Sequence, residues 1–100
     1  MFPDRIEKVI NSHPAVDLCC VVGVPDETRI NYAKAFIELN SGYDPTDKLK
    51  ANIRDFCQDK LPDYQIPDVI EFTDALPRTD RGKVDYRALE EMAKKDTHYA

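Results

Sequence analysis

Long hydrophobic runs are missing from this sequence. The longest apolar run covers residues 18–22, whereas a helix needs about 20 consecutive apolar residues to cross a bilayer. The start of the chain also lacks the apolar segment of a secretory signal peptide, because Phe2 is followed at once by Pro3, Asp4 and Arg5. We therefore expect no membrane span and no secretory leader.

Cysteine and histidine are too few and too scattered to indicate a metal site. The cysteines are Cys19, Cys20 and Cys57, and adjacent residues of a strand point to opposite faces, so the first two cannot easily hold one ion together. His13 has no second ligand at metal spacing and is interpreted as a helix-end residue. We expect no metal ligand. Unpaired cysteines are typical of a reducing cytoplasm, which is the expected location.

A surplus of positive charge is also missing. The sequence has 14 lysines and arginines against 19 acidic residues, which gives a net charge of −5 and a pI near 4.9. Nucleic acid is not an expected partner, because binding to its backbone needs a basic face. Basic residues gather only in one local patch, called the basic patch below, which consists of Arg78, Arg81, Lys83 and Arg87.

The length of the chain limits what it can do alone. A chain of 100 residues makes one domain that buries roughly 65% of the surface of its unfolded form. That suffices for a hydrophobic core, but seldom for a core together with a deep, closed site for a nucleotide and a second substrate. If the chain takes part in chemistry, we expect it to present residues to a site that another body completes.

Apolar periodicity and turn residues predict three helices and three strands. The first helix starts at Pro3 and ends before Pro14, the second follows a cap at Thr46, and the third covers residues 85–95. The predicted strands, of which the first two should form an antiparallel hairpin, cover residues 16–24, 32–39 and 69–72. The order α-β-β-α-β-α favours an α+β domain, a small three-stranded sheet with about three helices packed against it.

The same patterns predict finer features of these elements. Side chains of the second strand alternate, with even-numbered residues, Glu38 among them, on one side and odd-numbered residues on the other. The connection at residues 61–67 should be extended by its two prolines. The buried face of the last helix is expected to consist of Leu89, Met92 and Ala93, with Tyr86 beside them.

A polar turn at residues 79–83 (TDRGK) is the most informative local feature. It lies between the third strand and the last helix, and Gly82 together with a preceding proline should fix the backbone beside Lys83. A lysine aimed in this way is suited to an anionic group such as a phosphate or a carboxylate. The alternative is a plain solvated turn, because Asp, Arg and Gly are also common in such turns.

Six segments, taken in order along the chain, carry a family resemblance. They are residues 2–10 (FPDRIEKVI), 13–16 (HPAV), 22–27 (VGVPDE), 34–37 (KAFI), 61–67 (LPDYQIP) and 76–85 (LPRTDRGKVD). The series resembles the C-terminal domain of the adenylate-forming ligases, a superfamily that includes acyl-CoA synthetases, adenylation domains of non-ribosomal peptide synthetases, and luciferases. The resemblance covers most of the chain.

The resemblance implies what the whole enzyme would do. Such ligases join a carboxylic acid or an amino acid to ATP, release pyrophosphate, and pass the acyl group from AMP to a thiol of CoA or of a phosphopantetheine arm. A large N-terminal domain binds ATP, Mg²⁺ and the acid, and the small C-terminal domain closes over it as a lid and then rotates. Residues 1–100 would be this lid, inactive alone, with the N-terminal domain and the hinge outside the present sequence.

The resemblance also implies roles for particular residues. Lys83 would be the catalytic lysine that bridges the carboxylate and the α-phosphate, with Arg78, Thr79 and Gly82 supporting its turn. Residues 29–31 stand in the region that forms a face for the thioester stage. The sequence Arg29-Ile30-Asn31 departs there from the Arg-Gly-Glu-like turn of many members, so a solvated loop is the alternative for Arg29 and Asn31.

Two further alternatives stay open. Residues 82–85 (GKVD) slightly favour amino-acid-activating or carrier-loading members, since acyl-CoA synthetases more often continue with a basic helix start. The chain would alternatively be a stand-alone docking module for a carrier protein or a subunit, with the basic patch facing an acidic surface.

Overall fold

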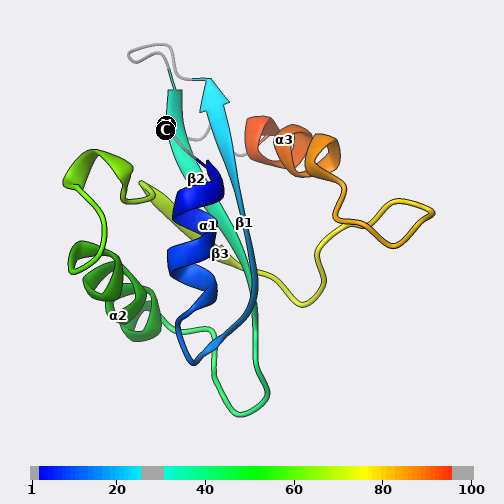
Figure 1. Cartoon of the computed structure of the whole chain (residues 1–100). Coiled ribbons are helices and arrows are strands. Elements are labelled where there is room, and N and C mark those ends of the chain that lie inside the picture. Colours follow the sequence, from blue (N-terminus) through cyan, green and yellow to red (C-terminus); the bar gives the residue numbers. More distant parts are fainter. Residues whose placement is uncertain (1–2, 26–30, 96–100) are drawn as a thin grey trace.

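The computed structural model describes residues 3–25 and 31–95. Within these ranges, helices and strands follow the predicted order α-β-β-α-β-α, with one additional 3₁₀ turn (Figure 1). The elements are α1 (Pro3–Asn11), β1 (Val16–Pro25), β2 (Asn31–Leu39), α2 (Asp47–Gln58), the 3₁₀ turn η1 (Asp63–Gln65), β3 (Val69–Phe72) and α3 (Tyr86–Lys95). The predicted α+β class is confirmed.

The three strands form one sheet in the order β1-β2-β3. β1 and β2 are antiparallel, with Val16 opposite Leu39 and Pro25 opposite Asn31, so the predicted hairpin is confirmed. β3 runs parallel to β2, beginning with Val69 opposite Lys34. A parallel neighbour needs a crossover connection, and the segment that contains α2 provides it.

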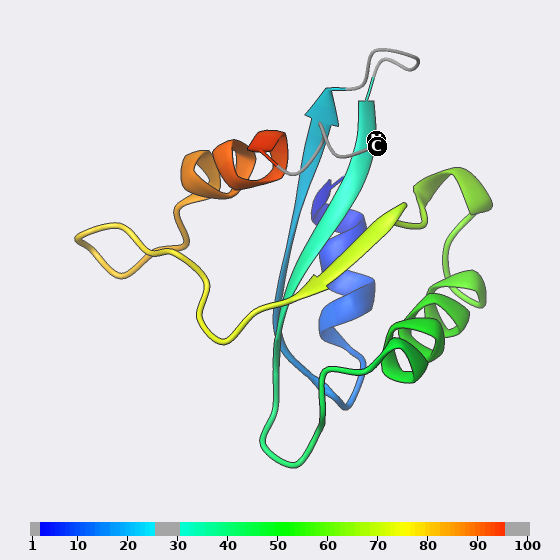
Figure 2. The same ribbon diagram turned by 180° about the vertical axis from the view of Figure 1, so that it is seen from behind.

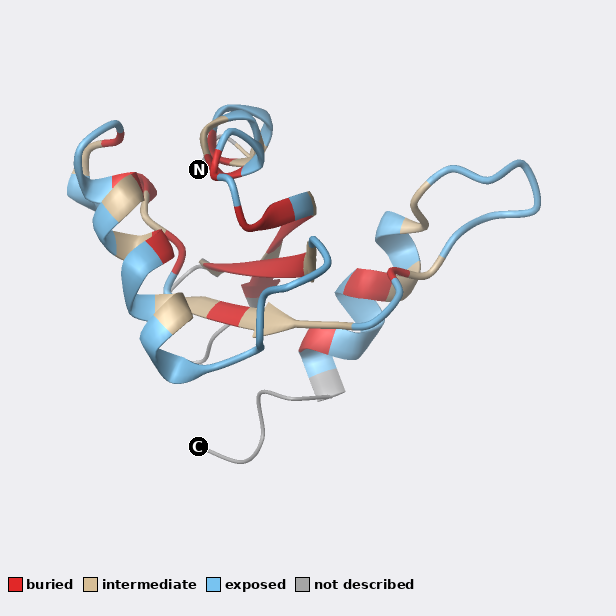
Figure 3. Ribbon diagram, turned by 90° about the horizontal axis from the view of Figure 1, so that it is seen from below, coloured by how far each residue is buried: buried red, intermediate tan, exposed pale blue. Residues whose placement is uncertain are grey.

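Helices cover both faces of the sheet, as the view from behind makes clear (Figure 2). α1 and α2 pack on one face, where Ile6, Ile10 and Ile53 join strand residues in one apolar cluster. α3 packs on the other face, where Leu89 and Phe36 belong to a second cluster. Figure 3 shows the buried residues concentrated in the sheet and on the sides of the helices that face it.

The two clusters confirm the predicted alternation of the strands. Cys19 belongs to the cluster under α1 and α2, whereas Cys20 belongs to the cluster under α3. In β2 the odd-numbered residues Ala35 and Ile37 lie in the first cluster and Phe36 lies in the second. The middle strand is therefore buried on both of its faces.

Three predicted details are wrong. Met92 and Tyr86 are not buried but 37% and 42% exposed, because Leu89 and Ala93, one turn apart, are the residues of α3 that face the sheet. The connection at residues 61–67 is not extended throughout. Its middle forms η1, which is closed by hydrogen bonds from Gln65 N–H to Pro62 O and from Ile66 N–H to Asp63 O. Pro62 comes just before the turn, a position at which the fixed φ and the missing N–H of proline are tolerated.

Side chains of α1 satisfy the outer edge of β1. Asn11 Oδ1 accepts the N–H of Cys19 at 2.8 Å, and Glu7 Oε2 accepts the N–H of Val21 at 2.7 Å. These amides lie on the side of β1 that faces away from β2. An exposed row of such groups is a template for pairing with another chain, and α1 removes part of it.

None of the described helices could span a membrane. The longest of them, α2, has 12 residues, and none in residues 3–25 and 31–95 combines the length and apolarity that a span requires.

Candidate functional site

Residues 76–85 form a hairpin that we call the Lys83 hairpin. It leaves the sheet after β3, projects from the body of the molecule, and returns to α3 (Figure 1). Its two arms meet in an antiparallel bridge between Arg78 and Val84. Thr79 N–H donates to Lys83 O at 2.7 Å, and Gly82 N–H donates to Thr79 O at 2.9 Å. The predicted turn is thus the tip of a closed hairpin rather than a simple corner between strand and helix.

Gly82 is required by the shape of this tip. Its φ is +85°, in the region that side chains other than glycine rarely adopt. An added Cβ would meet no atom of the described residues within 4 Å. The requirement is therefore conformational and does not come from close packing in the part of the chain that the structure describes.

Lys83 lies on the exposed part of the hairpin. Its ammonium forms no ion pair with any residue that the structure describes. The other members of the basic patch, Arg78, Arg81 and Arg87, are exposed as well. An exposed cation on a projecting, internally bonded hairpin is suited to an anion carried by another body.

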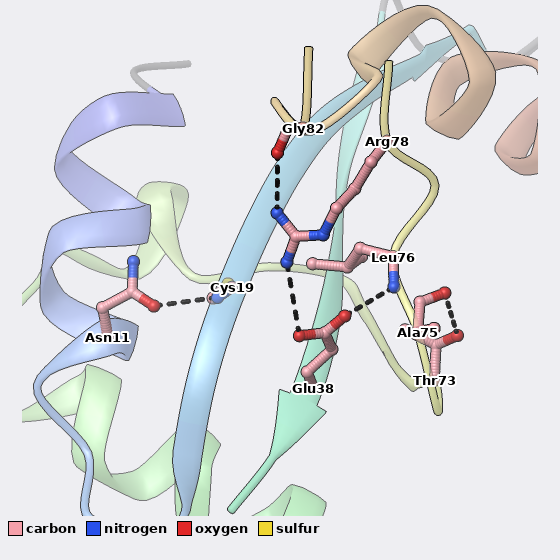
Figure 4. Close-up of polar contacts among 8 residues, drawn as sticks. All are labelled: Asn11, Cys19, Glu38, Thr73, Ala75, Leu76, Arg78 and Gly82. Carbon is pink, nitrogen blue, oxygen red and sulfur yellow. Dashed lines mark hydrogen bonds and ion pairs between the residues drawn. The ribbon is translucent and has the colours of Figure 1, made fainter. Parts of the chain in front are cut away.

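Glu38 ties the first arm of the hairpin to the sheet, a role that the sequence did not reveal. Its Oε2 accepts the N–H of Leu76 at 2.6 Å, and its Oε1 lies 3.8 Å from Nη2 of Arg78 (Figure 4). Arg78 Nη1 in turn donates to Gly82 O at 3.3 Å. The side chain of Leu76 is buried in the cluster under α3. The strand alternation placed Glu38 on the correct face, and a carboxylate on such a face was the available signal.

The second arm is fixed where it enters α3. Asp85 N–H donates to Pro77 O at 2.8 Å, and Asp85 Oδ1 accepts the N–H of Ala88 at 3.1 Å. Tyr86 Oη donates to Glu7 Oε2 at 2.9 Å and so links α3 to α1. The pKa of the Tyr86 hydroxyl is raised, mainly by desolvation and to a smaller extent by hydrogen bonds with Cys20 and Glu7. The hydroxyl therefore stays protonated and can donate.

Of the remaining sequence candidates, the structure describes only His13 in full. Arg29 lies outside the described residues, and only the backbone of Asn31 is described, as the partner of Pro25 in the sheet. Their place in a thioester-stage face stays a prediction. His13 is buried, accepts Ala15 N–H at Nδ1, and donates from Nε2 to Asn52 Oδ1 at 2.7 Å, so its role is structural.

Metal ligands do not gather in the part of the chain that the structure describes. No group of three or more His, Cys, Asp or Glu side chains there could hold an ion. Cys19, Cys20 and Cys57 are free and buried. The residues at hand do not fit a Mg²⁺ site, and we derive no step through a metal held by this chain.

Comparison with known proteins points to one family. The model of the family described as the AMP-binding enzyme C-terminal domain matches residues 5–83. The 4-hydroxybutyrate–CoA ligase 1 of Metallosphaera sedula is 42% identical over an alignment of 96 residues, which covers 93% of this chain and 17% of that enzyme. The acetyl-coenzyme A synthetase of Bacillus subtilis is 42% identical over 87 residues, covering 87% of this chain and 15% of that enzyme.

Solved structures agree with these sequence relatives. The anthranilate CoA ligase AuaEII in complex with anthranoyl-AMP aligns with a TM-score of 0.85 and 39% identity, over 93% of this chain and 18% of that one. The Brucella canis acyl-CoA synthetase gives a TM-score of 0.85 and 33% identity, over 91% and 17% of the two chains. This chain therefore spans less than a fifth of the length of these relatives.

Proposed function

Because this chain belongs to the family of AMP-binding enzyme C-terminal domains, we propose that it acts as the mobile lid of a larger AMP-forming ligase. That ligase would join a carboxylic acid to the thiol of CoA at the expense of ATP. The names of the relatives, which are CoA ligases, support CoA over a carrier protein as the acceptor. Nothing in the comparisons favours the alternative of a stand-alone docking module.

The observation that carries the proposal is the Lys83 hairpin. It places an exposed ammonium, unpaired within the described residues, at the end of a projecting element that is bonded internally and tied to the sheet. Within residues 3–25 and 31–95, Lys83 meets no anionic side chain. The site is completed when the lid closes over an N-terminal domain that binds ATP and the acid.

Lys83 would act in the first half-reaction. A carboxylate oxygen of the acid attacks the α-phosphorus of ATP, the bond from that phosphorus to the oxygen bridging to the β-phosphate breaks, and pyrophosphate leaves. The products are the acyl adenylate and pyrophosphate. The ammonium would contact both the carboxylate and the α-phosphate oxygens, where negative charge develops as the phosphorus becomes pentavalent. A preformed hairpin reduces the entropy lost in positioning the long side chain.

The second half-reaction would use another face of the same domain. After rotation of the lid, the thiol would lose its proton to solvent and its sulfur would attack the acyl carbon of the adenylate. The bond between that carbon and the phosphate oxygen breaks, and AMP leaves with the electron pair. Lys83 would by then have moved away from the reacting atoms. The two half-reactions should therefore depend on Lys83 to different degrees.

The test is Lys83→Ala in the intact ligase. Acid-dependent ATP–pyrophosphate exchange should fall by about 10²–10³, because a charge contact made in a water-excluded transition state is lost. Thioester formation from a preformed acyl adenylate should fall far less. Lys83→Arg should not restore exchange, since a planar guanidinium does not replace a point charge. Equal loss of both half-reactions in Lys83→Ala would refute the proposal.

Two controls accompany this variant. Lys48→Ala removes another exposed lysine, at the start of α2, and should leave both half-reactions unchanged. The 100-residue chain alone should give no exchange, because the proposed site needs the second domain.

A further inference from the structure

We propose that Glu38 is a positioning residue for Lys83, holding the Lys83 hairpin at a fixed place on the sheet. The inference rests on the proposed function, because it concerns the delivery of the same lysine. Glu38 lies near the end of β2, on the face that α3 covers, and its side chain is 14% exposed. The site residues that the sequence indicated all lie in the hairpin itself or in the region of residues 29–31, so Glu38 adds a contact from the sheet.

The stronger of its two contacts is with the backbone. Glu38 Oε2 accepts Leu76 N–H at 2.6 Å, across a separation of 38 residues. A hydrogen bond to an ionised carboxylate is shorter and stronger than a neutral one, and Glu38 is largely shielded from water. This bond holds the first residue of the hairpin beside β2, while the Leu76 side chain packs under α3.

The second contact reaches the tip of the hairpin. Glu38 Oε1 lies 3.8 Å from Arg78 Nη2, and Arg78 Nη1 donates to Gly82 O at 3.3 Å. The carbonyl of Gly82 belongs to the peptide group that also contains the nitrogen of Lys83. Because a peptide group is planar, a fixed Gly82 O orients the backbone from which the Lys83 side chain departs.

The hairpin needs such an anchor. A two-stranded hairpin is at best marginally stable by itself, and this one contains a single antiparallel bridge, between Arg78 and Val84. The Glu38–Arg78 pair is long and its arginine is half-exposed, so it contributes little by itself. The bond from Leu76 to Glu38 is therefore the main anchor, and the contact with Arg78 is the minor one.

This ranking separates two conservative variants. Glu38→Gln keeps an oxygen within reach of Leu76 N–H and loses the charge, whereas Glu38→Asp keeps the charge and withdraws the oxygens by one methylene. If the backbone bond is the anchor, Gln should rescue the hairpin and Asp should not. Should attraction to Arg78 be the anchor instead, the order would be reversed.

Amide hydrogen exchange, followed by mass spectrometry of the intact ligase, measures the anchor without reference to catalysis. In Glu38→Ala and Glu38→Asp, amides of residues 76–85 should exchange about 10-fold faster, because local opening becomes easier when the Leu76 bond is lost. In Glu38→Gln the rate should rise less, by roughly threefold, because a neutral oxygen still accepts the Leu76 N–H but more weakly than a carboxylate does. Peptides from α1 and α2 should be unchanged, which distinguishes positioning from general destabilisation.

Activity measures the consequence for Lys83. The rate of acid-dependent ATP–pyrophosphate exchange should fall about 10-fold in Glu38→Asp and remain near the parent value in Glu38→Gln, since misplacement of a catalytic group lowers the rate. Thioester formation from preformed adenylate should be retained in both variants. Asp74→Asn is the matched control, because Asp74 is an exposed carboxylate on the segment that leads into the hairpin, and it should behave like the parent.

The outcomes separate this inference from the proposed function. If the amides of residues 76–85 exchange hydrogen at the parent rate in Glu38→Asp, the inference is overturned whatever the activity. It is also overturned if Glu38→Asp is fully active while Lys83→Ala is inactive in adenylation. If Lys83→Ala itself is active, the proposed function fails, and Glu38 then positions nothing for this reaction. If Glu38→Ala does not fold, the comparison of Asp with Gln carries the test.

Discussion

At the scale of the single residue, the side-chain oxygen of Gln65 is buried without a hydrogen-bond partner among the residues that the structure describes. Gln65 closes the 3₁₀ turn η1 and is 2% exposed. Its side-chain oxygen, Oε1, accepts no hydrogen bond from any residue that the structure describes. A buried acceptor without a partner costs about 1–3 kcal/mol, because it has lost its hydrogen bonds to water.

We therefore predict that Gln65→Met stabilises the chain. Methionine has a similar length and shape without the polar atoms, so the free energy of unfolding should rise by about 1–3 kcal/mol. Urea denaturation of the 100-residue chain, followed by circular dichroism, measures the change. Gln58→Met, at an exposed position of α2, is the control and should have little effect. A less stable Gln65→Met protein would mean that the amide has a partner.

Single residues also show what the sequence could and could not predict. Gly82 and Lys83 were predictable because turn chemistry is local, and the left-handed φ of Gly82 agrees with it. The face on which Glu38 lies was predictable from strand alternation, but its role was not, because its partner Leu76 lies 38 residues away and no local pattern joins them. The prediction that Met92 is buried was wrong. The apolar stripe that the sequence pattern of the helix shows is wider than the part of the helix surface that the sheet covers.

The helix α2 is the element whose start is best explained at the scale of secondary structure. Thr46 has an extended backbone, and its side-chain oxygen accepts the N–H of Leu49 at 3.1 Å. The predicted cap is confirmed. It satisfies one of the amides that the first turn of a helix leaves without an internal partner.

Removal of this cap should destabilise the chain. Thr46→Ala is predicted to lower the free energy of unfolding by about 1 kcal/mol, whereas Thr46→Ser keeps the capping oxygen and should leave that free energy nearly unchanged. Chemical denaturation of the three proteins side by side measures both values. Equal losses in Thr46→Ala and Thr46→Ser would show that the methyl group, and not the hydroxyl, is the source of the stabilisation.

Elements were easier to predict than the way they pair. The hairpin of β1 and β2 was predicted because the two strands are close in sequence. The position of β3 beside β2, and its parallel direction, depend on the crossover through α2 and on which edge of the sheet remains free. These are properties of the assembled sheet, and a single four-residue strand carries no signal for them.

The whole molecule keeps three thiols in its two apolar clusters. Burial raises the pKa of Cys19, Cys20 and Cys57 above the ordinary value of 9.0. The folded chain therefore retains these protons at a pH where the unfolded chain releases them. Stability is unaffected well below that value and declines above it, by up to about 1.4 kcal/mol per pH unit for each thiol that is ionised only in the unfolded state.

We predict an alkaline loss of stability that depends on these thiols. The urea midpoint of the reduced 100-residue chain should be nearly constant from pH 7 to pH 8 and fall clearly by pH 10. Cys19→Ala, although less stable throughout, should show a shallower decline, since one titrating group has been removed. The slopes are compared, not the absolute values. A decline of equal slope in both proteins would assign the effect to other groups.

The helix side chains that occupy the free amides of β1 have a consequence beyond stability. With Asn11 and Glu7 bound to Cys19 and Val21, the rim of the sheet cannot readily accept a foreign strand there. A neighbour on that side must then be recognised by side chains rather than by main-chain zippering. Contact on that flank can consequently be strengthened or weakened by one surface substitution at a time, which main-chain pairing between strands would not allow.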